Sequence, residues 1–202
     1  MKTLSLKRLI KNSLFLSLFS LSLGQIGNKT SDLNFIFANN GYGFGFETTK
    51  QQNEVLQVGL DLRLYDIRRD EYTIYNEFYN QFGVIGEKSI LMIPVYGRIN
   101  YLLFQNKIAN NFKPYIFISA GALIAVDGNE NERSFRKKWF EAETQVVPSF
   151  STGFGVDFNS IGQGNSISLG LGYDYFKTKE PIHNKDDYGG IFLYLKYRIK
   201  SE

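Results

Sequence analysis

The sequence predicts an all-β protein, an eight-stranded antiparallel up-and-down transmembrane β-barrel that follows a cleaved signal peptide. Three observations support this fold class. Apolar and other residues alternate with period two along successive segments, which is the spacing of strands and not of helices. One face of these segments is rich in glycine and serine. The connections between the segments alternate in length, as they do in outer-membrane barrels.

The alternation is clearest near the C-terminus, in residues 166–200. Apolar or aromatic side chains occupy the odd positions from Ile167 to Tyr175 and from Ile191 to Ile199. Side chains of a strand point alternately to opposite faces, so each segment has one continuous apolar face. The same pattern predicts strands over residues 42–48, 56–65, 91–103, 115–126 and 149–158.

We assign the eighth strand to residues 72–82, where the alternation is only partial. Both ends of a bacterial barrel of this kind lie in the periplasm, which requires an even number of strands. With this strand included, the barrel covers residues 41–200. Residues 25–40 are mostly polar apart from the short patch Phe35-Ile36-Phe37, and are expected to form an N-terminal periplasmic segment.

Residues 1–24 have the organisation of a secretory signal peptide. Four basic residues between Lys2 and Lys11 precede an apolar run from Leu14 to Leu23, and small residues precede the expected cleavage site after Gly24. An N-terminal anchor helix is the alternative, but a run of about ten residues is too short to cross the ~30 Å hydrocarbon core. No later stretch is apolar enough to predict a transmembrane helix.

Composition excludes several classes of function. The chain has 13 Tyr, 18 Phe and 19 Gly, which favours a β protein, and it has no Cys, which excludes disulfides, thiolate metal sites and a cysteine nucleophile. The formal net charge of +3 depends on the signal region. Without that region 19 basic and 20 acidic residues remain, so no nucleic-acid partner is expected.

Alternation alone does not decide whether the apolar face meets lipid or encloses a ligand, as in a soluble lipocalin-like barrel. Glycine weakens a strand and gains nothing on a solvated outer face, whereas small residues inside a narrow barrel leave room for large ones. We therefore expect Leu171 and Leu195 to face hydrocarbon and Gly170 to face the lumen. Aromatic residues near the strand ends fit the interfacial girdles of a membrane barrel.

The connections give an orientation. Residues 127–144 and 178–187 are long and are expected outside the cell, whereas residues 105–112 and 159–164 are shorter and are expected in the periplasm. Lys50–Asn53 is the exception, because it is a short connection that this scheme places on the outer side.

Charged residues at inward positions predict an ion-paired plug. A charge in a narrow and partly dry lumen is costly unless it is paired. We expect Asp61 and Asp157 each to bind at least one of the basic side chains, with Glu47 and Asp174 nearer the outside. The predicted lumen ion-pair network is Asp61, Arg63, Arg98, Asp157, Lys196 and Arg198.

The longest outer connection contains a candidate interaction patch of basic and aromatic residues. Basic groups attract anionic headgroups and aromatic rings anchor at interfaces, so the patch is expected to bind lipopolysaccharide or a surface partner. The alternative is a short amphipathic helical turn in which Phe135 and Trp139 pair. The patch is Arg133, Phe135, Arg136, Lys137, Lys138, Trp139 and Phe140.

The chain also resembles the small bacterial outer-membrane β-barrel domain family of the OmpX/OmpW type, which is abundant in Bacteroidetes-like bacteria. The resemblance covers residues 40–200 and rests on the motifs Met92-Ile-Pro-Val-Tyr-Gly97, Lys113-Pro-Tyr115 and Leu195-Lys-Tyr-Arg-Ile199. It implies location in the bacterial outer membrane, with outer-membrane lipid and the barrel-assembly machinery as partners. Barrels of the family usually end on an aromatic residue, whereas this chain ends Lys200-Ser-Glu202.

No catalytic constellation, cofactor site or metal site is predicted. His183 is the single histidine and is expected to be an exposed loop residue, with no nucleophile or orienting group assigned to it. Acidic residues of the long loop match no calcium-loop spacing. The leading hypothesis is a non-enzymatic structural or surface-interaction barrel. The alternatives are a narrow conduit for small hydrophobic solutes, a lipid-modifying outer-membrane enzyme and a soluble lipocalin-like binder.

Overall fold

The computed structural model describes residues 28–69, 72–76, 81–85, 88–105, 107, 111–128, 139, 142–159 and 166–201 of the 202-residue chain. The expected signal peptide, residues 1–24, lies outside these residues. Among the residues described, no helix is long and apolar enough to cross a membrane.

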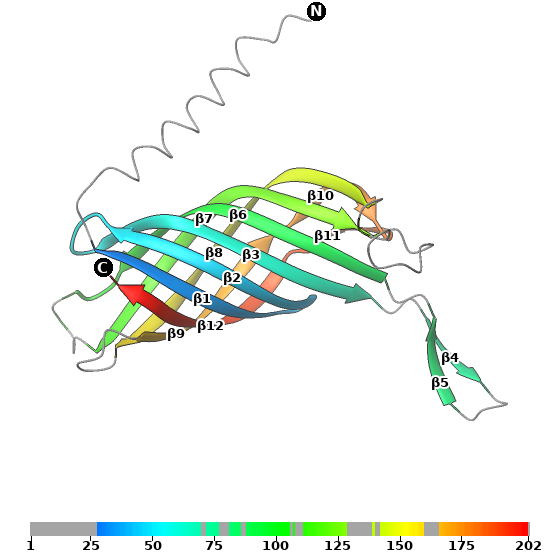
Figure 1. The fold of residues 1–202 in the computed structure, drawn as a ribbon, viewed down its shortest axis with the longest axis horizontal. Coiled ribbons are helices and arrows are strands. Elements are labelled where there is room, and N and C mark those ends of the chain that lie inside the picture. Colours follow the sequence, from blue (N-terminus) through cyan, green and yellow to red (C-terminus); the bar gives the residue numbers. More distant parts are fainter. Residues whose placement is uncertain are drawn as a thin grey trace, which may run out of the picture.

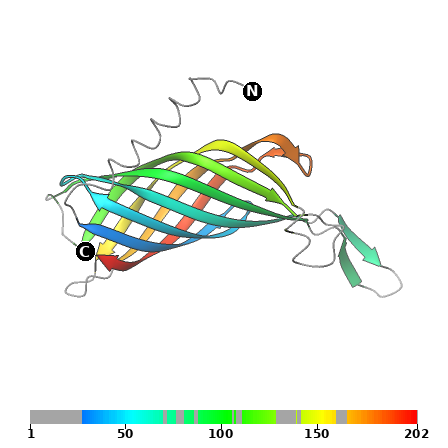
Figure 2. The same ribbon diagram turned by 45° about the horizontal axis from the view of Figure 1, so that its top comes forward.

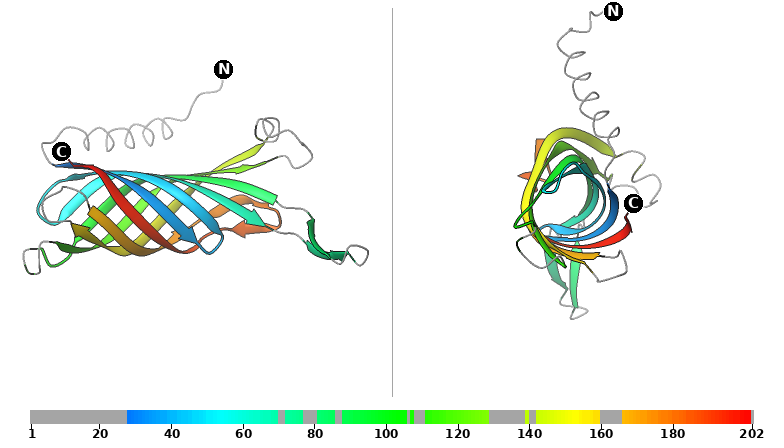
Figure 3. Two further views of the ribbon diagram at one scale, coloured as in Figure 1. Left: turned by 60° about the horizontal axis from the view of Figure 1, so that its bottom comes forward. Right: turned by 90° about the vertical axis from the view of Figure 1, so that its left-hand side faces the viewer.

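Eight antiparallel strands form a closed barrel, which confirms the predicted fold class (Figures 1 and 3). Their order around the barrel is β1-β12-β9-β8-β7-β6-β3-β2, so chain neighbours are barrel neighbours and the last strand closes on the first. The strands are β1 (Lys29–Ala38), β2 (Gly41–Gln51), β3 (Leu56–Arg69), β6 (Lys88–Leu102), β7 (Phe112–Asp127), β8 (Glu143–Asn159), β9 (Ser166–Tyr175) and β12 (Gly190–Ser201).

Two small hairpins interrupt the connections at one end of the barrel. β4 (Tyr72–Asn76) pairs only with β5 (Gln81–Ile85), and β10 (Lys177–Ile182) pairs with β11 (Lys185–Asp187). Figure 2 shows the β4–β5 hairpin beyond the barrel end, away from the barrel wall. The assignment of residues 72–82 to a barrel strand is therefore wrong, because both halves of this segment pair with each other.

The barrel instead gains its missing strand at the N-terminus. Residues 29–38 were expected in a periplasmic segment, yet β1 pairs along its length with β2 on one side and β12 on the other. Its polar residues Asp32 and Asn34 are buried inside the barrel while Leu33, Phe35 and Phe37 point outward and are exposed. The polar residues that suggested a loose segment thus lie on the face of a strand that points into the lumen.

Because β1 is the first strand of the barrel, β2 and β3 run in the direction opposite to the predicted one. The start of β1 and the end of β12 lie at the same end of the barrel, where Thr30 pairs with Ser201, so the short connection at residues 52–55 lies at that end and not on the outer side (Figure 1). The outer end instead has the two-residue turn Asn39–Asn40. The connections at the terminal end, residues 52–55, 103–111 and 160–165, are now all shorter than the other three outer connections, and the short exception moves to the outer turn Asn39–Asn40.

The outer surface of the barrel is a continuous apolar belt. Leu195 is 43% exposed and Leu171 is half-buried between the exposed residues Leu193 and Phe154 of its neighbouring strands. Gly170 faces inward, since a Cβ placed on it would meet the ring of Tyr194. In water such a surface would be unstable, whereas in a bilayer it is the expected lipid face of a barrel.

Glycines inside the barrel make room for large aromatic rings. A Cβ at Gly170 would lie 2.3 Å from the Tyr194 ring, and one at Gly172 would lie 2.4 Å from the Phe192 ring. Tyr194 is in turn hydrogen-bonded to Tyr115, with 2.7 Å between the two hydroxyl oxygens. The small residues of β8 and β9 and the aromatic residues of β7 and β12 therefore fill the lumen together.

This packing predicts the effect of adding a single methyl group. Gly170→Ala should destabilise the barrel by about 1–3 kcal/mol, because the buried Tyr194 ring has to move in a filled interior. Gly97→Ala is the matched control, since a Cβ there would meet only the Ala120 carbonyl oxygen at 3.8 Å. Urea unfolding of the reconstituted proteins measures both, and equal effects would show that the interior is not tightly packed at Gly170.

Candidate functional site: the charged lumen

Among the described residues, nine charged side chains on seven strands form a network in the barrel interior. The strands alternate inward and outward positions, so a charged residue on the inward face of any strand is removed from lipid. The nine are Asp32 on β1, Glu47 on β2, Asp61 and Arg63 on β3, Arg98 on β6, Asp157 on β8, Asp174 on β9, and Lys196 and Arg198 on β12.

The network begins near the outer end of the barrel at Asp174. Arg63 donates to Asp174 from Nη1 at 3.0 Å and to Asp61 from Nε at 2.9 Å and Nη2 at 2.7 Å. Tyr65 donates its hydroxyl proton to Asp174 at 2.6 Å. One buried guanidinium therefore joins two carboxylates that belong to strands on different sides of the barrel.

Arg98 continues the network toward the end with the termini. Its Nη1 lies 3.1 Å from Asp61 and its Nε lies 3.4 Å from Glu47. Lys196 reaches the other oxygen of Glu47 at 3.0 Å. Asn100 accepts from Arg98 at 2.8 Å and donates to Glu47 at 3.3 Å, which fills further hydrogen-bonding positions around the pair.

Arg198 forms the last cluster, near the chain termini. Its Nε donates to Asp32 at 3.0 Å, and its Nη2 lies 3.5 Å from Asp157. Ser168 donates to Asp157. This cluster joins β1, β8, β9 and β12, so it lies across the junction between the first and last strands.

Aromatic rings pack on the cations and exclude water from them. The guanidinium carbon of Arg98 lies 3.8 Å from the centroid of the Phe117 ring, and that of Arg63 lies 4.8 Å from the Phe192 ring. Lys196 lies 5.2 Å from the Tyr115 ring. Ring faces attract cations, and the attraction strengthens where water is excluded.

The described network has five acidic and four basic side chains, and it runs along most of the barrel. Asp61 and Glu47 are completely buried, and Arg63, Arg98 and Lys196 are at most 3% exposed. Burial of these charges is tolerable only because each one contacts an opposite charge. The arrangement can hold the lumen closed.

The structure brings the six lumen residues selected from the sequence into this network. Asp61 binds two of the named basic residues, and Asp157 binds Arg198. Sequence reasoning placed Glu47 toward the outside because it had β2 running the wrong way, whereas Glu47 is central. Asp32 is absent from the predicted network because residues 25–40 are predicted to form a periplasmic segment. An alternating reading of residues 30–38 would have found it.

The candidate loop patch falls mostly outside the described residues. Trp139 is described and is half-buried. The other six residues, Arg133, Phe135, Arg136, Lys137, Lys138 and Phe140, lie outside the described part of the chain.

The single histidine is not the exposed loop residue that was expected. His183 lies in the turn between β10 and β11, is 12% exposed, and places Nε2 3.1 Å from the Asp127 carboxylate at the end of β7. Its backbone φ is +50°, a conformation that residues other than glycine adopt at an energetic cost. The pair attaches the β10–β11 hairpin to the barrel rim. Within the described residues, no three His, Asp or Glu side chains are grouped to hold a metal ion.

The sequence matches no protein-family model and no curated protein. Among solved structures, the barrel is similar to neisserial surface protein A, with a TM-score of 0.52 and 11% identity over 86% of this chain and 94% of that one. The N-terminal β-barrel domain of OprF from Pseudomonas aeruginosa gives a TM-score of 0.48 at 10% identity over 86% and 98% of the two chains. Ail, the attachment invasion locus protein of Yersinia pestis, gives 0.42 at 14% over 87% and 100%.

At these identities the likeness concerns the fold, and the argument rests on the first of the three. It confirms, for the fold, the resemblance to small outer-membrane barrels that the sequence indicated. The apolar belt and the charged interior provide the membrane assignment independently, because closed barrels with this distribution span bacterial outer membranes. The chain is an eight-stranded membrane-spanning β-barrel with the fold of small bacterial outer-membrane proteins.

Proposed function

We propose that this outer-membrane barrel is a closed, non-enzymatic protein with a structural or surface-interaction role exerted through its outer loops. The observation that supports the proposal is the continuous ion-paired and aromatic filling of the lumen. Eight strands enclose only enough space for side chains or one small ligand. Here the described inward side chains occupy that space from Asp174 to Arg198.

The described part of the lumen next to Asp174 contains a small cavity. A cavity of about 10 Å³ lies beside Tyr65, Asp174 and Phe176, which is about the space for one water molecule. A narrow conduit for hydrophobic solutes would need apolar space through the centre, where this barrel has charged groups. Closure of the lumen therefore favours the interaction role over the conduit.

A conductance measurement tests the closed lumen. The unmutated protein in a planar bilayer should show no steady open channel, because ions cannot pass paired charges and stacked rings without breaking them. Asp61→Ala is the informative companion, since it removes the carboxylate shared by Arg63 and Arg98. Stable nanosiemens-scale conductance of the unmutated protein would contradict the plug and favour the conduit.

The outer connections support a role at the cell surface. Three of the four, at residues 70–87, 128–142 and 176–189, are longer than the terminal-side connections at residues 52–55, 103–111 and 160–165, and the fourth is the turn Asn39–Asn40. Loops of rigid barrels are common binding elements. We place the partner at these loops, with lipopolysaccharide as the anionic candidate for the basic and aromatic patch in residues 133–140.

Fluorescence of the single tryptophan tests that candidate. Trp139 should shift its emission to shorter wavelength when lipopolysaccharide is added to the folded barrel, because the indole enters a less polar interface. A variant with Arg136, Lys137 and Lys138 all replaced by Gln should need more lipopolysaccharide for the same shift. No shift in the unmutated protein would exclude lipopolysaccharide as the ligand of this patch.

A further inference from the structure

The barrel wall is notched at its outer end. The β1–β2 hairpin turns at Asn39–Asn40, well short of the ends of β3 and β6 (Figures 1 and 3). The last pair between β2 and β3 is Tyr42 with Asp66, so β3 continues through Ile67 without a partner on that side. On the other side, the last pair between β1 and β12 is Ala38 with Phe192.

A groove of about 780 Å³ occupies this notch. The β1–β2 turn forms its base, Ile67 and Tyr188 line it from opposite sides, and Lys185 and Asp66 are its charged lining residues. The volume is within the range of pockets that enclose a small ligand or a hydrocarbon chain. In a packed protein such a space is not left empty if the surroundings can fill it.

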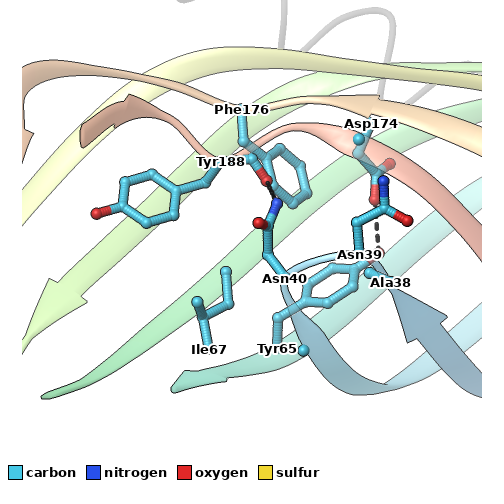
Figure 4. A pocket seen from close by; sticks show the side chains of 10 residues that line it. Ala38, Asn39, Asn40, Tyr65, Ile67, Asp174, Phe176 and Tyr188 are labelled. Atoms are coloured by element: carbon cyan, nitrogen blue, oxygen red, sulfur yellow. Dashed lines mark hydrogen bonds between the residues drawn. The ribbon is translucent and has the colours of Figure 1, made fainter. Parts of the chain in front are cut away.

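The groove is separated from the lumen by fixed side chains. Asn40 donates from Nδ2 to the carbonyl oxygens of Tyr188 at 3.0 Å and Gly189 at 3.2 Å, as Figure 4 shows for Tyr188. Tyr188 is buried and donates its hydroxyl proton to the carbonyl of Ile182. Behind them lies the water-sized cavity beside Asp174.

The groove opens instead onto the lipid-facing surface. Tyr42 and Phe44, which line its mouth, are 68% and 57% exposed and belong to the apolar belt. Leu64, across the β2–β3 pair from Phe44, is also exposed on that belt. Because the groove is continuous with the surface that contacts hydrocarbon, the molecule able to enter it from the side is a membrane lipid.

Lys185 supplies a cation beside the groove. Its Nζ donates to Asn40 Oδ1 at 3.1 Å and lies 5.2 Å from the centroid of the Tyr188 ring. An ammonium group has three donors, and this bond uses one of them, so others can face an anion. Asp66 is the acidic residue that lines the groove, and its negative charge weakens the binding of an anion there.

We propose that the notch is a lateral lipid-binding site, in which one acyl chain lies in the groove and the lipid phosphate binds the Lys185 ammonium. The site takes a phosphate-bearing lipid from the surrounding leaflet and does not connect to the lumen. The lipid covers the backbone of β3 beyond Asp66, which has no strand partner on the β2 side.

Native mass spectrometry of the folded barrel tests the charge part of the site. Detergent-solubilised protein is incubated with dioleoyl phosphatidylglycerol or with dioleoylglycerol, which has the same chains and no phosphate, and the retained lipid is counted. Lys185→Gln should lower phosphatidylglycerol retention about fivefold, the equivalent of about 1 kcal/mol for one basic residue near a membrane surface. Dioleoylglycerol should bind the unmutated protein about as weakly as phosphatidylglycerol binds the variant.

The matched control is Lys177→Gln on the same small hairpin. Lys177 is 55% exposed and pairs with the exposed Asp186, away from the groove, so its loss should leave retention unchanged. Asp66→Asn should increase phosphatidylglycerol retention, because it removes the groove's acidic charge. Equal effects of Lys177→Gln and Lys185→Gln, or no effect of Lys185→Gln, would overturn the phosphate site.

A groove-filling variant tests the acyl-chain part. Asn39 is an exposed turn residue with ordinary negative φ, so Asn39→Phe should fold, which heat-modifiable gel migration checks. Its ring should occupy part of the groove and reduce retention of phosphatidylglycerol. Retention that stays at the unmutated level would show that lipid binds elsewhere on the apolar belt, and would overturn the proposal.

Discussion

Replacing Asp61 by alanine should destabilise the barrel by about 3–5 kcal/mol if its surroundings are dry. The Asp61 carboxylate accepts from Arg63 at 2.7 Å and from Arg98 at 3.1 Å, and it is completely buried. Its loss leaves two buried guanidinium groups with one acidic partner each, Asp174 and Glu47. Removing one charge from a buried ion-pair network costs more free energy of unfolding than the intact network supplies, because the remaining charges stay buried without a full set of partners.

Urea unfolding in lipid vesicles, followed by heat-modifiable migration, measures this loss. Asp186→Ala is the control, because Asp186 pairs with Lys177 at 3.6 Å with both side chains more than half exposed. Such a surface pair contributes about 0–1 kcal/mol. If both variants lowered the free energy of unfolding by the same small amount, water would have to reach Asp61, and the lumen would be a hydrated channel.

Replacing Leu171 by arginine should weaken folding into bilayers by about 2–4 kcal/mol. Leu171 lies on the outer face of β9 between Leu193 of β12 and Phe154 of β8, inside the apolar belt. An arginine there has no partner in hydrocarbon and no inward position to occupy, because the neighbouring inward positions are filled.

Gln52→Arg is the matched control, since Gln52 lies in the short turn between β2 and β3, at the end of the barrel. Folding yields of both variants in phosphatidylcholine vesicles over a urea series give the comparison. An effect of Leu171→Arg no larger than that of Gln52→Arg would mean that the assigned outer face does not contact lipid.

The alternation from residue 88 onward was sufficient to predict five barrel strands in place and in the correct direction. The N-terminal part was not predictable in the same way. In β1 the inward positions Asp32 and Asn34 lower the mean hydropathy, and Ile36 also points inward and is buried. Leu33, Phe35 and Phe37 do form an alternating apolar outer face, but the inward face mixes polar and apolar side chains, so the alternation is obscured.

The requirement for an even strand number could not reveal the error. Exchanging β1 for the segment 72–82 leaves eight strands, so both readings place the termini at the same end. The outer turn Asn39–Asn40 has only two residues, so shortness alone gave only a weak sign of the error at the connection Lys50–Asn53. Treating it as a terminal-side turn would have reversed β2 and β3 and moved Glu47 toward Lys196, which it contacts at 3.0 Å.

The lumen network was predictable as a class and not as a set of pairs. Period-two position identifies which charges point inward, and the cost of unpaired charge requires them to meet. Which carboxylate binds which cation depends on the order and stagger of the strands around the barrel. Both depend on the presence of β1 between β12 and β2. The lateral groove left no sequence signal, because it depends on the unequal lengths of neighbouring hairpins.

The pairing of β1 with β12 sets the order in which this protein is completed. Arg198 and Asp32, which meet across this junction, are 166 residues apart in the chain, so the contact forms only after almost all of the polypeptide has been made. Closing so long a loop is entropically costly and slow. Before closure, Glu47, Asp32 and Asp157 lack the two β12 cations that bind them. Arrival of the last strand therefore removes the open edge and brings the formal charge of the described network from −3 to −1 in a single step, which makes release of a half-built barrel into the bilayer unfavourable.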